Sequence, residues 1–392
     1  MHEGRLVFAQ LTDHLPKTVF AKCVQRYPGR YPTLSFSHWS QFLCMLFAQL
    51  TYRASLRDIT TCLRSHSSKL YHAGFRGSIA RSTLADANER RDCRVFEDFA
   101  LHLIGIARAL YANDEFGVEL TQSVYAIDSS VVDLCLGLFN WAPATKGRAG
   151  IKLHTVLDLR GNIPAFIRVT GARVHDAKFL DHITPEAGSF YIMDRGYVHC
   201  ARLLRFARAG AFFVIRGFAD MHYHCIQACD ADESNGILQD EHIVLRGQFT
   251  RKDYPDTLRR ILFIDRERNK ELVLFTNQFG LSGLQIAQLY KARWQVELFF
   301  KWIKQNLRIK SFIGTSENAV KIQIWTAISA YVMVAIVKKR LDCSASLHEM
   351  LQILSLALFE TTPLQTLLIR AQGVDDDPLQ LQFPLFGKIS GQ

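Results

Sequence analysis

Hydrophobic residues recur at helical spacing through the first third of the chain. Apolar positions three and four residues apart predict amphipathic helices in three stretches, residues 39–50, 56–63 and 96–110. From about residue 121 the pattern changes to short apolar, β-rich runs separated by turn signals such as Arg160-Gly161-Asn162. The chain is therefore expected to combine a helical N-terminal domain, residues 1–120, with a mixed α/β part.

Two short helices are expected inside the N-terminal domain, at residues 55–66 and 83–92. The second opens on Thr83-Leu84-Ala85-Asp86, a capping pattern, and then carries Asn88, Arg90 and Arg91, which are able to reach phosphates or base edges. A helix-turn-helix on DNA fits this pair. Two helices and a turn are also how all-helical domains are built, so both interpretations are open.

The β-rich runs of the second part predict a sheet. They lie at residues 124–127, 151–159, 162–170, 190–193 and 211–216. Residues 151–170 resemble a hairpin, and a helical segment at 199–209 lies between two strand candidates, which indicates a mixed sheet with a crossover helix.

Residues 218–280 are more polar but still alternate, at 243–249, 260–265 and 272–276, and predict a β-rich insertion. A long helix is expected from residue 282, and another through 322–340. The predicted units are residues 1–120, 121–217, 218–280, 281–340 and a C-terminal helical tail at 341–392.

Charge narrows the class of partner. The 392 residues include 47 Lys and Arg against 37 Asp and Glu, a net charge of +10. Such a surplus favours a polyanion, either nucleic acid or an anionic membrane surface. The longest apolar run, residues 322–337, contains Gln323, Thr326 and Ser329 and is short for a membrane span, so we expect a buried helix and no membrane.

Cysteine use and the N-terminus favour a cytoplasmic protein. The nine cysteines show no repeated spacing, and no apolar segment follows the polar start, so the thiols are expected to be reduced. His222, His224, Cys225 and Cys229 are able to ligate zinc, but no second pair follows at finger-like distance. We expect these residues to belong to an irregular loop.

Two aspartates share one local setting. Asp128 directly follows the apolar run 124–127, and Asp194 follows the run 190–193. A carboxylate at the edge of a buried sheet loses hydration and needs a compensating charge, which Mg²⁺ or Mn²⁺ supplies in many proteins. Asp128-Ser129-Ser130 and Asp194-Arg195-Gly196 are also ordinary turn sequences, so a plain turn is the alternative.

A lone acid stands among cations in residues 281–310. Glu297 is surrounded by six basic residues: Lys291, Arg293, Lys301, Lys304, Arg308 and Lys310. On a helix, one sector of roughly 80° holds Tyr290, Arg293, Glu297, Lys301, Lys304 and Arg308, and apolar residues fill the neighbouring sector. The pairs Arg293–Glu297 and Glu297–Lys301 are suited to ordinary helix ion pairs. Six cations around one acid, a net charge of +5, instead favour a surface for phosphates.

These residues match a family pattern. Tyr290-x2-Arg293-x3-Glu297-x6-Lys304 resembles the signature of DDE transposases of the insertion-sequence-four family. Asp194-Arg195-Gly196-Tyr197 is similar to the motif around that family's second metal-binding aspartate, and Asp128 lies where the first is expected. The resemblance covers residues 120–340 strongly and the N-terminal helices only loosely.

The resemblance implies a ribonuclease H-like catalytic core, interrupted by the β-rich insertion and preceded by a helical DNA-binding domain. It implies a catalytic, metal-binding triad of Asp128, Asp194 and Glu297 holding two Mg²⁺ ions, with Mn²⁺ able to substitute, roughly 3.5–4 Å apart. It implies DNA contacts from Tyr290, Arg293, Lys304 and, for base stacking, Trp294; the positive stripe adds Lys301 and Arg308. The expected activity is cut-and-paste movement of a bacterial insertion sequence: cleavage at the terminal inverted repeats of double-stranded DNA, then transfer of the 3′-OH to target DNA.

A homodimer is expected, because two ends must be brought together. His154 and the pair His175-Asp176 lie near the core strands and are read as structural side chains or as assistants to the chemistry. Two other functions remain open from sequence: a nuclease or resolvase of the same fold, and a non-catalytic DNA-binding repressor derived from a transposase.

Overall fold

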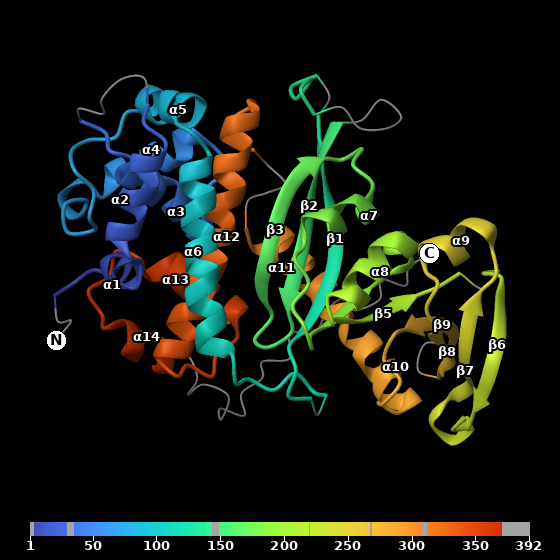
Figure 1. The fold of residues 1–392 in the computed structure, drawn as a ribbon. Helices are drawn as coiled ribbons and strands as arrows, with labels where there is room; N and C mark the ends of the chain where they lie inside the picture. The colour runs from blue at the N-terminus through green and yellow to red at the C-terminus, as the bar shows by residue number, and fades with distance from the viewer. Residues whose placement is uncertain are drawn as a thin grey trace, which may run out of the picture.

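The computed structural model describes residues 4–29, 35–118, 120–135, 137–142, 149–218, 220–266, 269–307 and 312–370. A helical body lies on one side and a long twisted sheet on the other (Figure 1). The N-terminal helices are α1 (Val7–Asp13), α2 (Lys17–Arg26), α3 (His38–Leu50), α4 (Leu56–Ser65), η1 (Ser67–Lys69), α5 (Arg81–Arg90) and α6 (Arg94–Tyr111). The helices expected at residues 39–50, 56–63 and 96–110 are thus confirmed.

Helix α5 begins earlier than its capping pattern predicts, and two of its polar residues point inward. Its N-cap is Ala80, so the cap expected at Thr83 is wrong. Asn88 is buried and accepts a hydrogen bond from Gln41, and Arg91 donates to the carbonyls of Ser37 and Phe36. Both side chains hold α5 against α3, which removes them from any surface that meets DNA and leaves Arg90 exposed.

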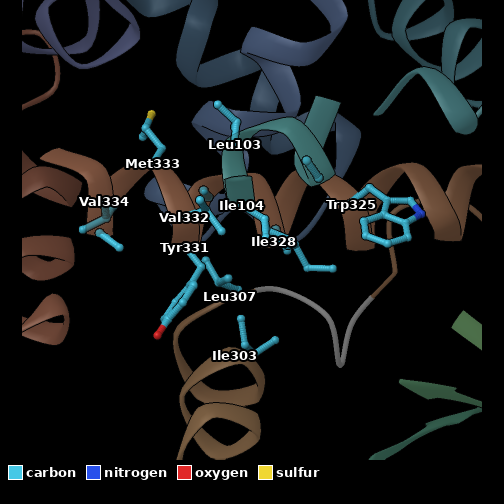
Figure 2. Packing of buried hydrophobic residues seen from close by; sticks show 14 of the residues in the cluster. Leu103, Ile104, Ile303, Leu307, Trp325, Ile328, Tyr331, Val332, Met333 and Val334 are labelled. Atoms are coloured by element: carbon cyan, nitrogen blue, oxygen red, sulfur yellow. The ribbon is translucent and has the colours of Figure 1, made fainter. Parts of the chain in front are cut away.

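The last described helices return to the helical body. They are α12 (Glu317–Arg340), α13 (Leu347–Ala357) and α14 (Leu364–Arg370). Figure 2 shows α12 beside α6, with Leu103 and Ile104 of α6 among the buried side chains around Ile328 and Val332. The N-terminus is tied to the same end of the chain, since the Val7 amide donates to the Glu360 carbonyl at 2.8 Å.

Helix α12 contains the apolar run 322–337 that the sequence singled out. Among the described residues it is the one helix long and apolar enough to cross a membrane, and 94% of its apolar stretch is buried inside the protein. Its side chains are covered by α6 and α3 on one side and by α11 on another. The expectation of a buried core helix is confirmed.

The sheet has nine strands in the order β3-β2-β1-β4-β5-β9-β8-β7-β6. Their bounds are β1 (Val124–Leu134), β2 (Ala149–Asp158), β3 (Ile163–Gly171), β4 (Phe190–Met193), β5 (Phe212–Arg216), β6 (Tyr223–Cys229), β7 (Ile237–Leu245), β8 (Leu258–Asp265) and β9 (Lys270–Thr276). Strands β1, β4 and β5 are parallel, β2 and β3 form the expected antiparallel hairpin, and α8 (Cys200–Arg208) is the expected crossover between β4 and β5. The order and direction of the first five strands give the ribonuclease H-like core that the resemblance implies.

The β-rich segment after residue 217 extends this same sheet. Strand β9 pairs antiparallel with β5, and β8, β7 and β6 follow outward, with α9 (Gln248–Asp253) between β7 and β8 (Figure 1). The buried pair Arg259–Asp240 joins β8 to β7 through two hydrogen bonds of 2.6 and 2.8 Å. Residues 223–229 form the edge strand β6, so the expectation of an irregular loop at His224, Cys225 and Cys229 is wrong.

The β2–β3 hairpin is fastened to the helical body at its turn. Gly161 and Asn162 both have positive φ, and the ring of Tyr111 packs so closely on Gly161 that no side chain fits there. The Tyr331 hydroxyl of α12 donates to the Asn162 carbonyl at 3.0 Å, and the Tyr111 hydroxyl donates to the Ala335 carbonyl at 2.9 Å. Sheet and helices are therefore held by direct polar contacts as well as by apolar packing.

Candidate active site

Neighbouring parallel strands bring Asp128 and Asp194 to the same level. The register pairs Ile127 with Met193, and the two aspartates follow directly. Because side chains alternate along a strand, Asp128 shares the face of Ala126, which packs in the larger core with the helices. Asp128 does not end its strand as the sequence suggested, because β1 continues to Leu134. Only Asp194 stands at a strand end, directly before the short helix η3 (Arg195–Tyr197), and its side chain makes no capping hydrogen bond there.

Glu297 comes to this face from the helical segment after β9. The single long helix expected from residue 282 is two helices, α10 (Gly283–Ala292) and α11 (Trp294–Asn306), with Arg293 between them. At this point the Arg293 amide donates to the Tyr290 carbonyl, and the Val296 amide donates to the Arg293 carbonyl. Each hydrogen bond spans three residues, whereas those of an α-helix span four. Such a tight turn within a helical run is often found at functional sites.

Apolar packing holds α10 and α11 in place. The stripe expected to be buried is buried: Ile286, Leu289, Val296, Phe299, Phe300, Ile303 and Leu307. Phe299 and Trp302 pack edge-on against Tyr331, and Figure 2 shows Ile303 and Leu307 directed toward the α12 side chains. Ser282 begins α10 with a full capping box, so both ends of this segment are fixed.

Arg293 lies between two of the three carboxylates. Its Nη1 donates to Asp128 Oδ2 at 3.2 Å and its Nη2 donates to Glu297 Oε1 at 2.6 Å. The Tyr290 hydroxyl donates to Asp194 Oδ1 at 3.3 Å. The side chains that the sequence assigned to catalysis and to the DNA signature are thus in direct contact. Arg293 is 165 residues from Asp128 along the chain, and Tyr290 is 96 residues from Asp194, so only the packing of the helical segment against β1 and β4 brings them together.

The electrostatics of Asp128 show how crowded the negative charge is. Burial, with the nearby charges of Glu297 and Asp194, raises the pKa of Asp128 to about 6, although the Ser129 amide and the Arg293 guanidinium oppose the rise. Burial also raises the pKa of the Tyr290 hydroxyl to about 12, which keeps it a hydrogen-bond donor at neutral pH. A site where burial and neighbouring carboxylates raise the pKa of one acid is a site that a bound cation stabilises.

The donor set fits a hard divalent ion in its chemistry. Three carboxylates supply the oxygen ligands that Mg²⁺ and Mn²⁺ prefer. In the present arrangement of the described residues, no group of three His, Cys, Asp or Glu side chains is close enough together to hold one metal ion. At this site the reason is visible, because the Arg293 guanidinium occupies the space between Asp128 and Glu297.

The remaining residues predicted to contact DNA lie along α11. Trp294 and Lys301 are exposed, as a role in DNA contact requires. Lys304 donates to the Val131 carbonyl at 2.7 Å, so it also joins α11 to the end of β1. Arg308 lies outside the described residues.

Sequence reasoning singled out Asp176 but missed the polar cluster that it forms on the opposite face of β1. Asp176 Oδ1 accepts from Ser129 Oγ at 2.6 Å and from Lys152 Nζ at 2.9 Å, and Lys152 also donates to the Val174 carbonyl. Burial would raise the pKa of Asp176, but the hydrogen bonds from Ser129 and Lys152 outweigh it and hold the pKa below its usual value. Only the β1–β2 register, which pairs Val131 with Lys152, reveals this contact.

The two histidine sites near the core strands have structural partners. His154 is fully buried, shares a hydrogen bond of 3.0 Å with Thr170 Oγ1 and stacks on Phe179. His175 caps α7 (Asp176–Phe179) by accepting from the Ala177 amide. Their contacts favour the structural interpretation of both.

The sheet topology defines a class: a ribonuclease H-like fold, with Asp128, Asp194 and Glu297 on the sheet face covered by α10 and α11. Comparison with known families places the chain within it. A family model described as "Transposase DDE domain" matches residues 119–333, more than half of the chain. The chain belongs to this family and is a DDE transposase. A second model, "Domain of unknown function (DUF4372)", matches residues 3–76.

Named relatives agree with the family. The chain is 35% identical to the "Putative transposase y4zB" of Sinorhizobium fredii over 64% of this chain and 70% of the relative. It is 33% identical to the "Probable transposase for insertion sequence element IS5377" of Geobacillus stearothermophilus, over 53% of this chain and 54% of the relative. It is 25% identical to the "Putative transposase for insertion sequence element IS4SA" of Synechocystis, over 80% of this chain and 87% of the relative.

A solved structure also aligns with the chain. The cryo-EM structure of the piggyBac transposase synaptic complex with hairpin DNA covers 95% of this chain and 81% of its own, with a TM-score of 0.45 and 9% identity.

Proposed function

We propose that Asp128, Asp194 and Glu297 are the catalytic, metal-binding residues of this transposase. The observation that supports this is their convergence: two neighbouring parallel strands and the helix α11 bring all three carboxylates to one face of the sheet. Nothing else among the described residues gathers acids in this way beside exposed cations. The metal is proposed to be Mg²⁺, with Mn²⁺ able to substitute.

A bound pair of divalent ions would activate a water or a 3′-hydroxyl and stabilise the leaving oxygen at the phosphodiester. The protein's own contribution is positional. Strands β1 and β4 fix Asp128 and Asp194, and the capped, apolar-packed α10–α11 segment fixes Glu297 against them.

The cations of α11 are proposed to bind the DNA backbone. Trp294 and Lys301 are exposed about one helical turn before and after Glu297, so DNA that reaches the carboxylates also meets them. Tyr290, Arg293, Lys304 and Arg308 complete the proposed DNA contacts. Tyr290 and Arg293 now bond the carboxylates, and binding DNA or metal would require Arg293 to exchange partners.

The substrate is proposed to be the terminal inverted repeats of a bacterial insertion sequence, in line with the names of two relatives. The signature of Tyr290, Arg293, Glu297 and Lys304 supports membership of the insertion-sequence-four family. In this proposal residues 1–120 bind DNA, a homodimer holds the two ends, and the protein acts in the cytoplasm.

The test is cleavage of a duplex that carries the DNA flanking this coding sequence in its genome. Wild type is expected to cut it with Mg²⁺ and to lose activity with EDTA. Asp194→Ala is expected to bind the duplex but not to cut it, whereas Asp133→Ala, an exposed carboxylate on the same strand as Asp128, is expected to cut normally. Joined products would demonstrate strand transfer. Cleavage by Asp194→Ala would overturn the triad, and specific binding without cleavage by wild type would favour the repressor.

A further inference from the structure

The helical body has a basic surface that the acidic site does not use. Between residues 57 and 81 the sequence has five Lys and Arg but one acid, Asp58. The four arginines of this segment, Arg57, Arg64, Arg76 and Arg81, are all exposed. None of their guanidinium groups forms an ion pair or hydrogen bond with a described residue, in contrast to the exposed Arg26, Arg94 and Arg208, which each pair with an aspartate.

One of these arginines borders a groove of about 290 Å³. Arg64 lines it from α4, together with Tyr71, and Leu63, Phe75 and Ile79 form its apolar floor. Arg57 lies two turns before Arg64 on the same face of α4. Arg76 stands between the lining residues Phe75 and Gly77, and Arg81 follows Ile79 by two residues.

Tyr71 at this groove is unusually exposed. It is 80% accessible to solvent, among the most exposed large hydrophobic side chains of the described chain. Tyrosine keeps an apolar ring and a polar tip, so an exposed one beside arginines suits a partner that offers both flat rings or sugars and negative charge. Figure 1 shows α4 on the side of the helical body away from the sheet, where a second body has room to approach.

We propose that this surface, Arg57, Arg64, Tyr71, Arg76 and Arg81 around the groove, docks double-stranded DNA through its phosphates. The inference rests on the proposed function, since it takes DNA as the substrate. It replaces the surface that the capping pattern at Thr83 suggested, where Asn88 and Arg91 are committed to α3. Unpaired arginines are the side chains best suited to phosphates, because their planar fork binds two oxygens at once and is weakly hydrated.

The experiment measures binding of full-length protein to the flanking duplex and to a scrambled duplex of equal length, by fluorescence anisotropy in EDTA over a series of salt concentrations. The test variant is Arg57→Gln/Arg64→Gln/Arg76→Gln. The control is Arg26→Gln/Arg94→Gln/Arg208→Gln, which removes the same charge from arginines that are exposed but paired. Melting temperatures confirm that both remain folded.

The test variant is expected to bind about tenfold or more weakly than wild type and to lose about 2 to 3 from the slope of log K against log salt, the value for three lost phosphate contacts. The control should keep the slope of wild type. Tyr71→Ala is expected to weaken binding further with no change of slope, because it removes no charge.

An equal loss of DNA affinity in the test and control variants would overturn the proposed docking surface, because it would show that only the net charge of the protein matters. Unchanged binding by the test variant, with wild-type cleavage intact, would overturn it while leaving the acidic site standing. Wild-type protein that neither binds nor cuts DNA would instead overturn the proposed function and this surface with it. Capture of an acidic peptide, with DNA binding unaffected by the variant, would likewise refute DNA as the occupant.

Discussion

The Arg293 guanidinium lies 2.6 Å from the Glu297 carboxylate, one helical turn away, and reaches Asp128 at 3.2 Å with its other amino group. This cation holds together two acids that come from different parts of the chain. It also occupies the space where the proposed metal ion would be shared by these two acids. If the proposed site is correct, Arg293 links the stability of the metal-free protein to its ability to bind metal.

Arg293→Gln is expected to destabilise the metal-free protein, because it leaves buried carboxylates without their cation, at a cost of about 1–3 kcal/mol. Without the guanidinium, the carboxylates of Asp128 and Glu297 repel each other more strongly, and a bound Mn²⁺ ion would relieve this repulsion. The rise in melting temperature on adding Mn²⁺ should therefore be larger for the variant than for wild type. Differential scanning fluorimetry with EDTA or Mn²⁺ measures both. Lys301→Gln, an exposed cation on the same helix, is the control. An equal Mn²⁺ response in the two variants would show that Arg293 does not compete with metal.

Asp128 predicts a pH dependence of stability. Its pKa is about 6 in the folded protein against an ordinary value of 3.8. Because this pKa is raised on folding, the protonated carboxyl contributes to the stability of the folded protein below about pH 4. That contribution is lost as the pH rises through 6, since the folded protein must then ionise a buried acid. In EDTA, Asp128→Asn is therefore expected to stabilise the protein by about 2–3 kcal/mol above pH 6, at about 1.4 kcal/mol per pKa unit.

The gain from Asp128→Asn should shrink toward zero as the pH falls from 6 to 4. Denaturant unfolding at several pH values measures it. Asp133→Asn, on an exposed position of the same strand, should show no such trend. A gain that does not depend on pH would contradict the assignment of the effect to ionisation of Asp128.

Lys152 is expected to stabilise the β1–α7 junction behind the active site. Lys152→Met removes its hydrogen bonds to Asp176 and to the Val174 carbonyl, and we expect a loss of about 1.5–3 kcal/mol at neutral pH. The pKa of Asp176 is held low, so this contribution should fade as the pH drops below about 4. Urea unfolding at pH 7 and at about pH 2.5 tests it, with the exposed Lys178→Met as the control.

The buried pair Arg259–Asp240 is expected to hold the outer strands to the core. Its side chains are 7% and 4% exposed, and Arg259 also donates to the Leu281 carbonyl just before α10. Asp240→Asn leaves a buried arginine without its counter-charge and should cost about 3–5 kcal/mol. Asp256→Asn in the exposed pair with Arg208 should cost less than about 1 kcal/mol. Thermal or urea unfolding compares them, and equal losses would show that burial of the pair is unimportant.

The sequence by itself determined the elements and the chemistry. Helical spacing located α3, α4, α6 and α12, and apolar runs located the core strands, because periodicity reports directly which face of an element is buried. The acidic residues and their basic neighbours could be singled out because isolated acids after apolar runs, or among cations, are costly without a partner.

Only the tertiary structure decided which of these residues meet. The parallel register of β1 and β4 sets Asp128 beside Asp194, and the tight turn at Arg293 aims its guanidinium between Asp128 and Glu297. It also turned Asn88 and Arg91 inward, where the local sequence had suggested DNA contacts. Such contacts join residues tens to hundreds of positions apart, and local periodicity carries no information about strand order or about which polar side chains find a buried partner.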